Sequence, residues 1–214
     1  MHRAVFVDRD GVICRNRRDH VKSWEEFEFL PGVLEAMAQL ARLDMPIVVI
    51  TNQAAIHRGM VAAETVQDIH TRMVRQIEAA GGRTDGVFYC PHRPDEDCDC
   101  RKPRPGMLLQ AADMLGIDLT RSYLIGDARS DIQAGRAVGA RCYLVLTGRG
   151  RQQVWHCWLN GESDFRVTPS LATAVREIIG RESQLRVGRP IYGLPQRANR
   201  WKQGSIAYKG EVGQ

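Results

Sequence analysis

Short apolar runs alternate along the chain with stretches in which apolar residues recur every three or four positions. Runs rich in β-branched and aromatic residues, which predict strands, occupy residues 4–7, 47–50, 87–89, 123–125, 142–146 and 165–167. Helical spacing covers residues 33–41, 63–80, 105–115, 131–138 and 169–179. Because strands alternate with helices, the sequence predicts parallel strand pairing and an α/β fold with a doubly wound, Rossmann-like sheet. Residues 151–164 match no pattern.

The net positive charge of the chain is confined to its C-terminal part. The 214 residues include 30 Lys and Arg and 25 Asp and Glu. Residues 181–214 hold seven of the former and two of the latter, so residues 1–180 hold 23 of each and carry no net charge. We therefore expect one folded domain over 1–180 and a basic, flexible tail over 181–214, with no nucleic-acid partner for the folded part.

Hydropathy gives no sign of a membrane or of export. No apolar run approaches the roughly 18 residues that a membrane span needs, and the first residues lack the apolar core of a secretory signal. The six cysteines are then expected to be thiols or metal ligands rather than disulfides. With no coiled-coil pattern in the sequence, we expect a cytoplasmic monomer without a membrane partner.

Polar residues follow three of the expected strands, at the edge of the sheet where ligands of doubly wound folds bind. These residues are Asp8 and Asp10, then Thr51, Asn52 and Gln53, then Asp127 with Asp131 four positions later. Carboxylates brought this close would raise one another's pKa unless a cation balanced them, and Mg²⁺ prefers oxygen ligands. Lys102 could add a fixed positive charge for a phosphate. An isolated Asp after a strand is usually a turn residue or helix cap, and Asp131 could simply cap the 131–138 helix.

Taken together, these segments resemble the motifs of the haloacid dehalogenase-like phosphatases. The matching text is Phe6-Val7-Asp8-Arg9-Asp10-Gly11-Val12, Thr51-Asn52-Gln53, Arg101-Lys102-Pro103 and Ile125-Gly126-Asp127, and the resemblance spans about residues 4–180. It implies that Asp8 is the nucleophile and that Asp10 is the general acid and base. It also implies that Thr51 and Lys102 hold the phosphoryl oxygens. Catalytic Mg²⁺ would be bound by Asp8, the Asp10 backbone carbonyl and Asp127.

Four soft metal ligands fall within eleven residues: Cys90, His92, Cys98 and Cys100. Three thiols and one imidazole suit a closed, tetrahedral structural Zn²⁺ site, although unconnected loop thiols are the alternative. A zinc-binding loop here would fix Arg101 and Lys102 without taking part in the chemistry. The remaining cysteines are expected to be packing residues, and His57 and His70 are expected to be solvated or capping residues.

A second stretch narrows the resemblance to two capless groups, the heptose bisphosphate phosphatases and the histidinol-phosphatase domains. The matching residues are Cys90-Pro91-His92 and Cys98-Asp99-Cys100-Arg101-Lys102-Pro103-Arg104-Pro105-Gly106-Met107. About 40 residues separate Asp10 from Thr51, which leaves no room for a cap domain. Loops must then bind the substrate, a small phosphorylated metabolite, and we expect contacts from Arg17, Asn52, Gln53, Arg58 and Arg101. Cationic loops favour a sugar bisphosphate over histidinol phosphate, whose amine they would repel. A nucleic-acid-binding protein held by zinc, or a catalytically dead scaffold of the same fold, is the non-enzymatic alternative.

Overall fold

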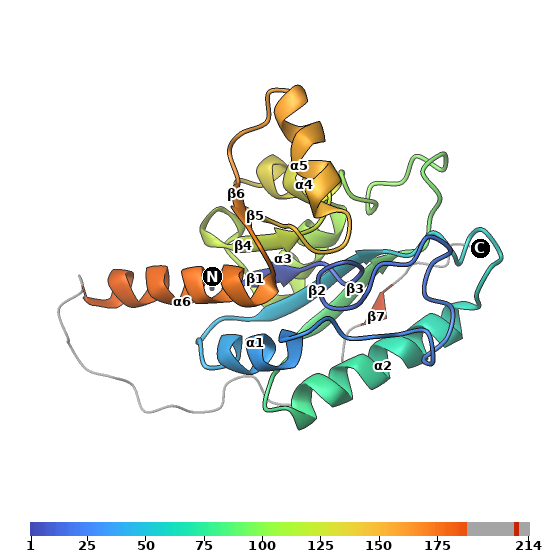
Figure 1. Cartoon of the computed structure of the whole chain (residues 1–214), viewed down its shortest axis with the longest axis horizontal. Coiled ribbons are helices and arrows are strands. Elements are labelled where there is room, and N and C mark those ends of the chain that lie inside the picture. The colour runs from blue at the N-terminus through green and yellow to red at the C-terminus, as the bar shows by residue number, and fades with distance from the viewer. Residues whose placement is uncertain (188–207, 210–214) are drawn as a thin grey trace.

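A seven-stranded parallel sheet forms the centre of the computed structural model, which describes residues 1–187 and 208–209 (Figure 1). Its strands are β1 (Val5–Val7), β2 (Ile47–Asn52), β3 (Gly86–Cys90), β4 (Tyr123–Gly126), β5 (Arg141–Val145), β6 (Arg166–Thr168) and β7 (Tyr208–Lys209). They lie in the order β6-β5-β4-β1-β2-β3-β7, and every neighbouring pair is parallel. The predicted doubly wound α/β sheet is therefore confirmed.

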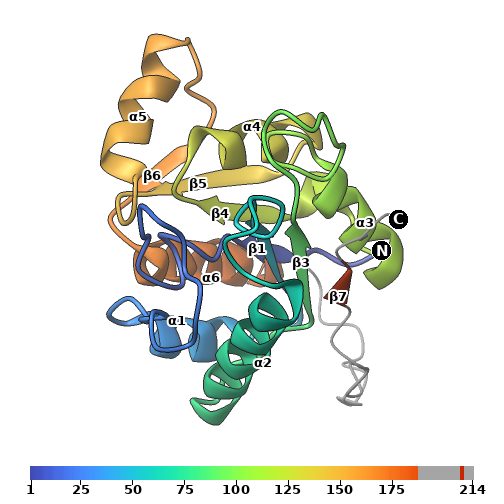
Figure 2. The same ribbon diagram turned by 90° about the vertical axis from the view of Figure 1, so that its right-hand side faces the viewer.

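Helices cover both faces of the sheet (Figure 2). One layer holds α1 (Val33–Leu40), α2 (Ala63–Ala79) and α6 (Leu171–Val187), and the other holds α3 (Gly106–Leu115), α4 (Arg129–Ala137) and α5 (Gly150–Leu159). Strand side chains alternate between the two layers, so that Val5 and Val7 pack under the first helices and Phe6 packs under the second. Both faces are buried, which explains the continuous apolar strands.

Two helices differ from the sequence expectation. Helix α5 lies in the stretch that matched no pattern, because apolar residues stand on both its covered and its exposed side: Val154 and Cys157 are buried, whereas Trp155 and Trp158 are exposed. Helix α6 continues past residue 179, where the apolar spacing is interrupted by Glu182, a charged residue that is nevertheless buried and accepts hydrogen bonds from Arg3 and Tyr123. The predicted tail, 181–214, thus begins within α6, and most of it lies outside the described residues. No helix in the described ranges is long and apolar enough to cross a bilayer.

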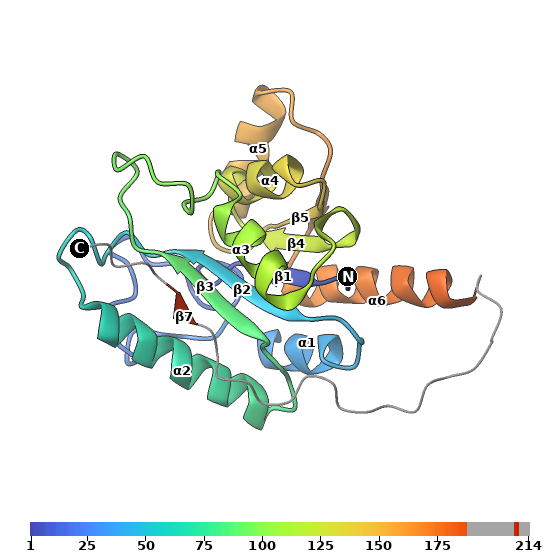
Figure 3. The same ribbon diagram turned by 180° about the vertical axis from the view of Figure 1, so that it is seen from behind.

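The central position of β1 gathers three loops at one edge of the sheet (Figure 3). Val7 pairs with Val49 on one side and with Ile125 on the other, so the residues that follow each strand emerge together. The connections at 8–32, 53–62 and 91–105 contain neither a helix nor a strand. Loops, rather than a separate cap domain, therefore surround the carboxyl edge.

Candidate active site

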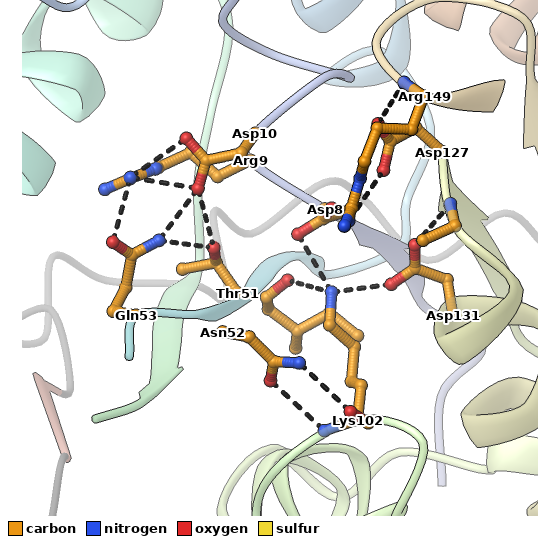
Figure 4. Close-up of polar contacts among 12 residues, drawn as sticks. Asp8, Arg9, Asp10, Thr51, Asn52, Gln53, Lys102, Asp127, Asp131 and Arg149 are labelled. Atoms are coloured by element: carbon orange, nitrogen blue, oxygen red, sulfur yellow. Dashed lines mark hydrogen bonds and ion pairs between the residues drawn. The ribbon is translucent and has the colours of Figure 1, made fainter. Parts of the chain in front are cut away.

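Lys102 is the centre of a buried charge cluster (Figure 4). Its Nζ donates to Asp8 Oδ1 at 2.8 Å and to the Ile50 carbonyl at 3.0 Å, and it lies 2.6 Å from Asp131 Oδ1. All three charged side chains are almost inaccessible to solvent. An ammonium group is thus held between two carboxylates from different parts of the chain, where their electrostatic interaction is stronger than in water.

Asp127 adds a third carboxylate, fully buried beside the other two. Its Oδ2 accepts a hydrogen bond from the Arg149 backbone N–H at 2.7 Å, and the Arg149 guanidinium lies 3.5 Å from Oδ1. Oδ1 has no hydrogen-bond partner among the described residues. Oxygen atoms of Asp8, Asp127 and Asp131 all lie within 4.8 Å of one another. Three converging carboxylates, one with a buried oxygen that accepts no hydrogen bond, are a donor set that fits a hard divalent cation such as Mg²⁺.

Charge repulsion and burial shift the pKa values of this cluster. Burial raises the pKa of Asp8 to about 8, because Lys102 offsets only part of the desolvation cost. Burial and the neighbouring Asp131 raise the pKa of Asp127 to about 6. Burial alone would lower the pKa of Lys102, but the two carboxylates outweigh it and raise that pKa. The Lys102 ammonium therefore stays charged, but its single positive charge is not enough to keep the Asp8 carboxylate ionised at neutral pH. A bound divalent cation would supply the missing positive charge.

Asp10 points away from Lys102 into a second polar group. Arg9 Nη2 donates to Oδ1 and Oδ2 of Asp10 at 3.0 and 2.9 Å, and Gln53 Nε2 donates to Oδ2 at 2.8 Å. Thr51 Oγ1 also donates to this oxygen at 3.4 Å. Burial alone would raise the pKa of Asp10, but the Arg9 ion pair and these hydrogen bonds hold it below its usual value. Asp10 is thus a carboxylate at neutral pH in this arrangement.

The four soft ligands also come together. Cys90 Sγ lies 3.5 Å from both His92 Nδ1 and Cys98 Sγ, and Cys100 Sγ lies 3.2 Å from His92 Nδ1 and 3.6 Å from Cys98 Sγ. A tetrahedral site with Zn–S bonds of about 2.3 Å has ligand–ligand edges of about 3.8 Å. Side-chain hydrogen bonding from Cys90 lowers the pKa of Cys100 to about 5. The alternative of unconnected loop thiols does not describe this geometry.

Asn52 and Gln53, both expected to contact substrate, have other partners. Asn52 accepts from the Lys102 backbone N–H at 3.1 Å and donates to the Lys102 carbonyl at 3.0 Å. Gln53 is buried, and its amide bonds to Asp10, Thr51 and Arg9 at 2.8, 2.8 and 3.0 Å. Successive side chains at the end of β2 point to opposite faces, so Asn52 holds the lysine loop while Gln53 faces Asp10.

The three arginines expected to bind substrate differ in whether a carboxylate of the protein already pairs with them. Arg17 lies 3.5 Å from Asp19 and 3.6 Å from Glu26, so nearby carboxylates already balance its charge. Arg58 contacts His20 at 3.4 Å, and Arg101 donates to the His92 carbonyl at 3.1 Å. Neither of these two forms an ion pair with a carboxylate in the described part of the chain.

Sequence reasoning missed or misplaced three residues of the site. Asp131 is an ion-pair partner of Lys102 as well as the residue that accepts from the Ala128 N–H at 3.0 Å. Arg149 precedes α5, in the part of the chain without a readable pattern, and no signal pointed to it. The expectation that His70 is solvated or capping is wrong: it is fully buried on α2, 2.9 Å from Arg9. Its position within the apolar stripe of that helix was the available signal.

Comparison with known proteins places this site in a family. The HAD-hydrolase-like family profile matches residues 99–174. The D-glycero-beta-D-manno-heptose-1,7-bisphosphate 7-phosphatase of Bordetella bronchiseptica is 40% identical over 177 residues, covering 83% of this chain and 98% of that enzyme. The enzyme of the same name from Pseudomonas putida is 40% identical over 150 residues, covering 70% of this chain and 86% of the relative.

A solved structure is similar over the same region. The crystal structure of D,D-heptose 1,7-bisphosphate phosphatase from B. bronchiseptica, complexed with magnesium and phosphate, superposes with a TM-score of 0.78 at 36% identity. The match covers 84% of this chain and 99% of that one. Fold and sequence together define a phosphatase of the haloacid dehalogenase-like hydrolases. Within them, the chain belongs to the family that these heptose bisphosphate phosphatases represent.

Proposed function

We propose that this phosphatase removes the 7-phosphate of D-glycero-D-manno-heptose 1,7-bisphosphate, with Mg²⁺ as cofactor and a phosphorylated Asp8 as intermediate. The observation that carries the proposal is the buried contact between Asp8 and Lys102 beside Asp127. Relatives named for this reaction support the choice of substrate. We also infer that the protein works as a monomer in the cytoplasm, without a nucleic-acid partner.

Asp8 acts as the nucleophile on the phosphorus atom. Asp8, Asp127 and the Asp10 backbone carbonyl would hold Mg²⁺, which supplies the charge that lets a carboxylate approach a phosphate dianion. Lys102 and Thr51 bind the phosphoryl oxygens, and Asp131 keeps the Lys102 ammonium beside the nucleophile. Breaking the ester by way of a covalent intermediate replaces one difficult displacement with two easier ones.

Asp10 moves the protons of the reaction. It gives a proton to the leaving oxygen as the ester breaks, and it later takes one from the water that hydrolyses the phosphorylated Asp8. The resting carboxylate must therefore acquire a proton before the first step. A phosphate dianion bound nearby favours this, because negative charge raises the pKa of a neighbouring carboxyl group.

The arginine geometry favours a substrate with a second phosphate. Of the three arginines expected at the substrate, Arg58 and Arg101 have no carboxylate partner in the described residues, so a second anionic group would not have to displace a carboxylate to bind them. The test is phosphate release from heptose bisphosphate, heptose monophosphates, other sugar phosphates and histidinol phosphate with Mg²⁺. We expect the highest kcat/KM for the heptose bisphosphate. A higher kcat/KM for histidinol phosphate would identify that compound as the substrate instead. No phosphate release from any ester would overturn the proposal.

The pKa shifts predict how Mg²⁺ stabilises the fold at different pH values. Since folding raises the pKa of Asp8 to about 8 and that of Asp127 to about 6, the metal-free folded state binds more protons than the unfolded state. The contribution of these two carboxyl groups to the free energy of unfolding should therefore fall as pH rises from about 5 to about 8. Mg²⁺ binds the ionised carboxylates, so the increase in Tm on adding it should be larger at the higher pH. An equal increase in Tm at about pH 5 and about pH 8 would contradict this. Asp8→Asn should weaken the dependence of the metal-free protein's free energy of unfolding on pH.

We further propose that Cys90, His92, Cys98 and Cys100 bind a structural Zn²⁺ ion that fixes the lysine loop. Cys100 lies two residues before Lys102, so the order of this loop bears directly on the Lys102 side chain. Elemental analysis should find one zinc per chain, which Cys98→Ser should lose and Cys157→Ala, outside the cluster, should keep. The zinc-free protein should keep its far-UV circular dichroism but lose at least about tenfold in kcat, as expected when a reacting group is displaced. Full activity without zinc would refute the proposal.

A further inference from the structure

Asp10 is held by residues that have no direct part in the proposed reaction. Arg9 and Gln53 bind its carboxylate, and His70 contacts Arg9; we call these three residues the Asp10 clamp. All three are buried, with Arg9 and His70 showing no exposed side-chain surface. A guanidinium this deep in a protein costs free energy unless its N–H groups are paired, so its partners are not incidental.

His70 lies on α2 and contacts Arg9, from which it is 61 residues away in sequence. Its Nε2 lies 2.9 Å from Arg9 Nη1, and Arg9 Nη2 binds Asp10 and Gln53. Arg9 Nε has no partner among the described residues. Within those residues, His70 is therefore the contact that fixes the guanidinium on the side away from Asp10.

The chemistry of the pair sets the state of the imidazole. A guanidinium has only donors, so His70 must accept through the Nε2 lone pair and be neutral, with its proton on Nδ1. Burial and the adjacent Arg9 charge keep the pKa of His70 well below its usual value, in agreement with a neutral ring. Tyr89 packs against the ring at a centroid distance of 5.6 Å and limits its rotation.

We propose that His70 is a positioning residue for proton transfer: its Nε2 anchors Arg9, and Arg9 orients the Asp10 carboxylate. The inference rests on the proposed function, in which Asp10 protonates the leaving oxygen. Without the anchor, Arg9 has a buried N–H with no acceptor and can rotate toward another one. Asp10 then loses the pair of hydrogen bonds that defines its direction, and small misplacements of a reacting group reduce rates strongly.

Two substrates with different leaving groups distinguish a role in proton transfer from a general loss of structure. An alkyl phosphate needs its leaving oxygen protonated, whereas p-nitrophenyl phosphate leaves as a stable phenolate and depends little on the acid. The comparison uses kcat/KM, which reports the steps up to departure of the leaving group. The variants are His70→Leu, which removes the acceptor, and His70→Gln, whose side-chain oxygen can accept from Arg9.

We expect His70→Leu to lose about 10- to 100-fold in kcat/KM on the sugar phosphate but less than about threefold on p-nitrophenyl phosphate. His70→Gln should stay within about threefold of wild type on both substrates. Equal losses on both substrates in a folded His70→Leu, no loss on either, or a folded His70→Gln that behaves like His70→Leu would overturn the role of His70 alone. A wild-type protein inactive on both substrates would overturn the proposed function as well.

A measurement on the wild-type protein keeps the inference testable if His70→Leu does not fold. Imidazole ¹⁵N shifts, assigned to His70 by comparison with His70→Gln, should report a neutral ring protonated on Nδ1 between about pH 6 and pH 8. A ring protonated on Nε2, or an imidazolium in this range, would exclude the hydrogen bond from Arg9 and overturn the proposal.

Discussion

Asp8→Asn should abolish phosphate release while leaving the protein folded. The amide has nearly the shape of the carboxylate but cannot attack phosphorus, and loss of a nucleophile costs on the order of 10⁵- to 10⁶-fold in kcat. Lys102 keeps its contacts with Asp131 and the Ile50 carbonyl in the variant. Because the buried carboxylate is removed, we expect the metal-free variant to be at least as stable as the wild type. Phosphate release and chemical denaturation check the two effects.

Asp113→Asn provides the matched control. Asp113 is an exposed residue of α3, so the same chemical change there should leave both activity and stability unchanged. Turnover by folded Asp8→Asn at a measurable fraction of the wild-type rate would contradict a nucleophilic role. Such a result would leave Asp8 as a metal ligand only.

Gly11→Ala should have the second-largest effect on activity, because the added methyl group would displace Asp127 from its position beside Asp8. Gly11 has a φ of +88°, and an added Cβ would collide with Asp127 Oδ2 and lie 3.1 Å from the Gly148 Cα. Either Asp127 leaves its position or the loop after β1 moves, and both changes separate the carboxylates. We expect kcat to fall by about 100-fold or more, together with weaker binding of Mg²⁺ in calorimetry.

Gly81→Ala separates this collision from backbone strain. Gly81 has a φ of +82°, close to that of Gly11, but no atom lies within 4 Å of where its Cβ would be. Both variants incur the roughly 1–2 kcal/mol that an L-residue pays at such a φ, and only Gly11→Ala adds the collision. Gly81→Ala should therefore lose stability and keep its activity. If Gly11→Ala also kept its activity, the close approach to Asp127 would have no functional meaning.

Strand-end positions could be predicted from sequence because parallel strands place their carboxyl ends at one edge. This rule predicts that Asp8 and Asp127 lie close together, and the register of β1 with β2 and β4 agrees with it. The rule gives the location of a residue but not the direction of its side chain. Gln53 shows the difference, since it follows β2 as expected, but its amide binds the buried Arg9 and Asp10 and does not face a substrate as predicted.

Other parts of the site could not be predicted because their partners are distant in sequence. His70 lies on a regular helix, and nothing near it in sequence indicates that α2 brings it to Arg9. Arg149 precedes helix α5, in which the exposed Trp155 and Trp158 obscure the apolar spacing that would have predicted a helix. Asp131 had a sufficient local explanation as a residue that accepts from the Ala128 N–H, which hid its ion pair with Lys102.

The central claim is that the Asp8 carboxylate captures the phosphoryl group, and trapping that intermediate tests it most directly. The enzyme would be mixed with substrate and Mg²⁺, quenched in acid within a turnover, reduced with borohydride and digested for mass spectrometry. Borohydride converts an acyl phosphate to an alcohol, so we predict homoserine at position 8 and unmodified aspartate at positions 10, 127 and 131. Conversion at another aspartate, or none in an enzyme that turns over, would contradict the account.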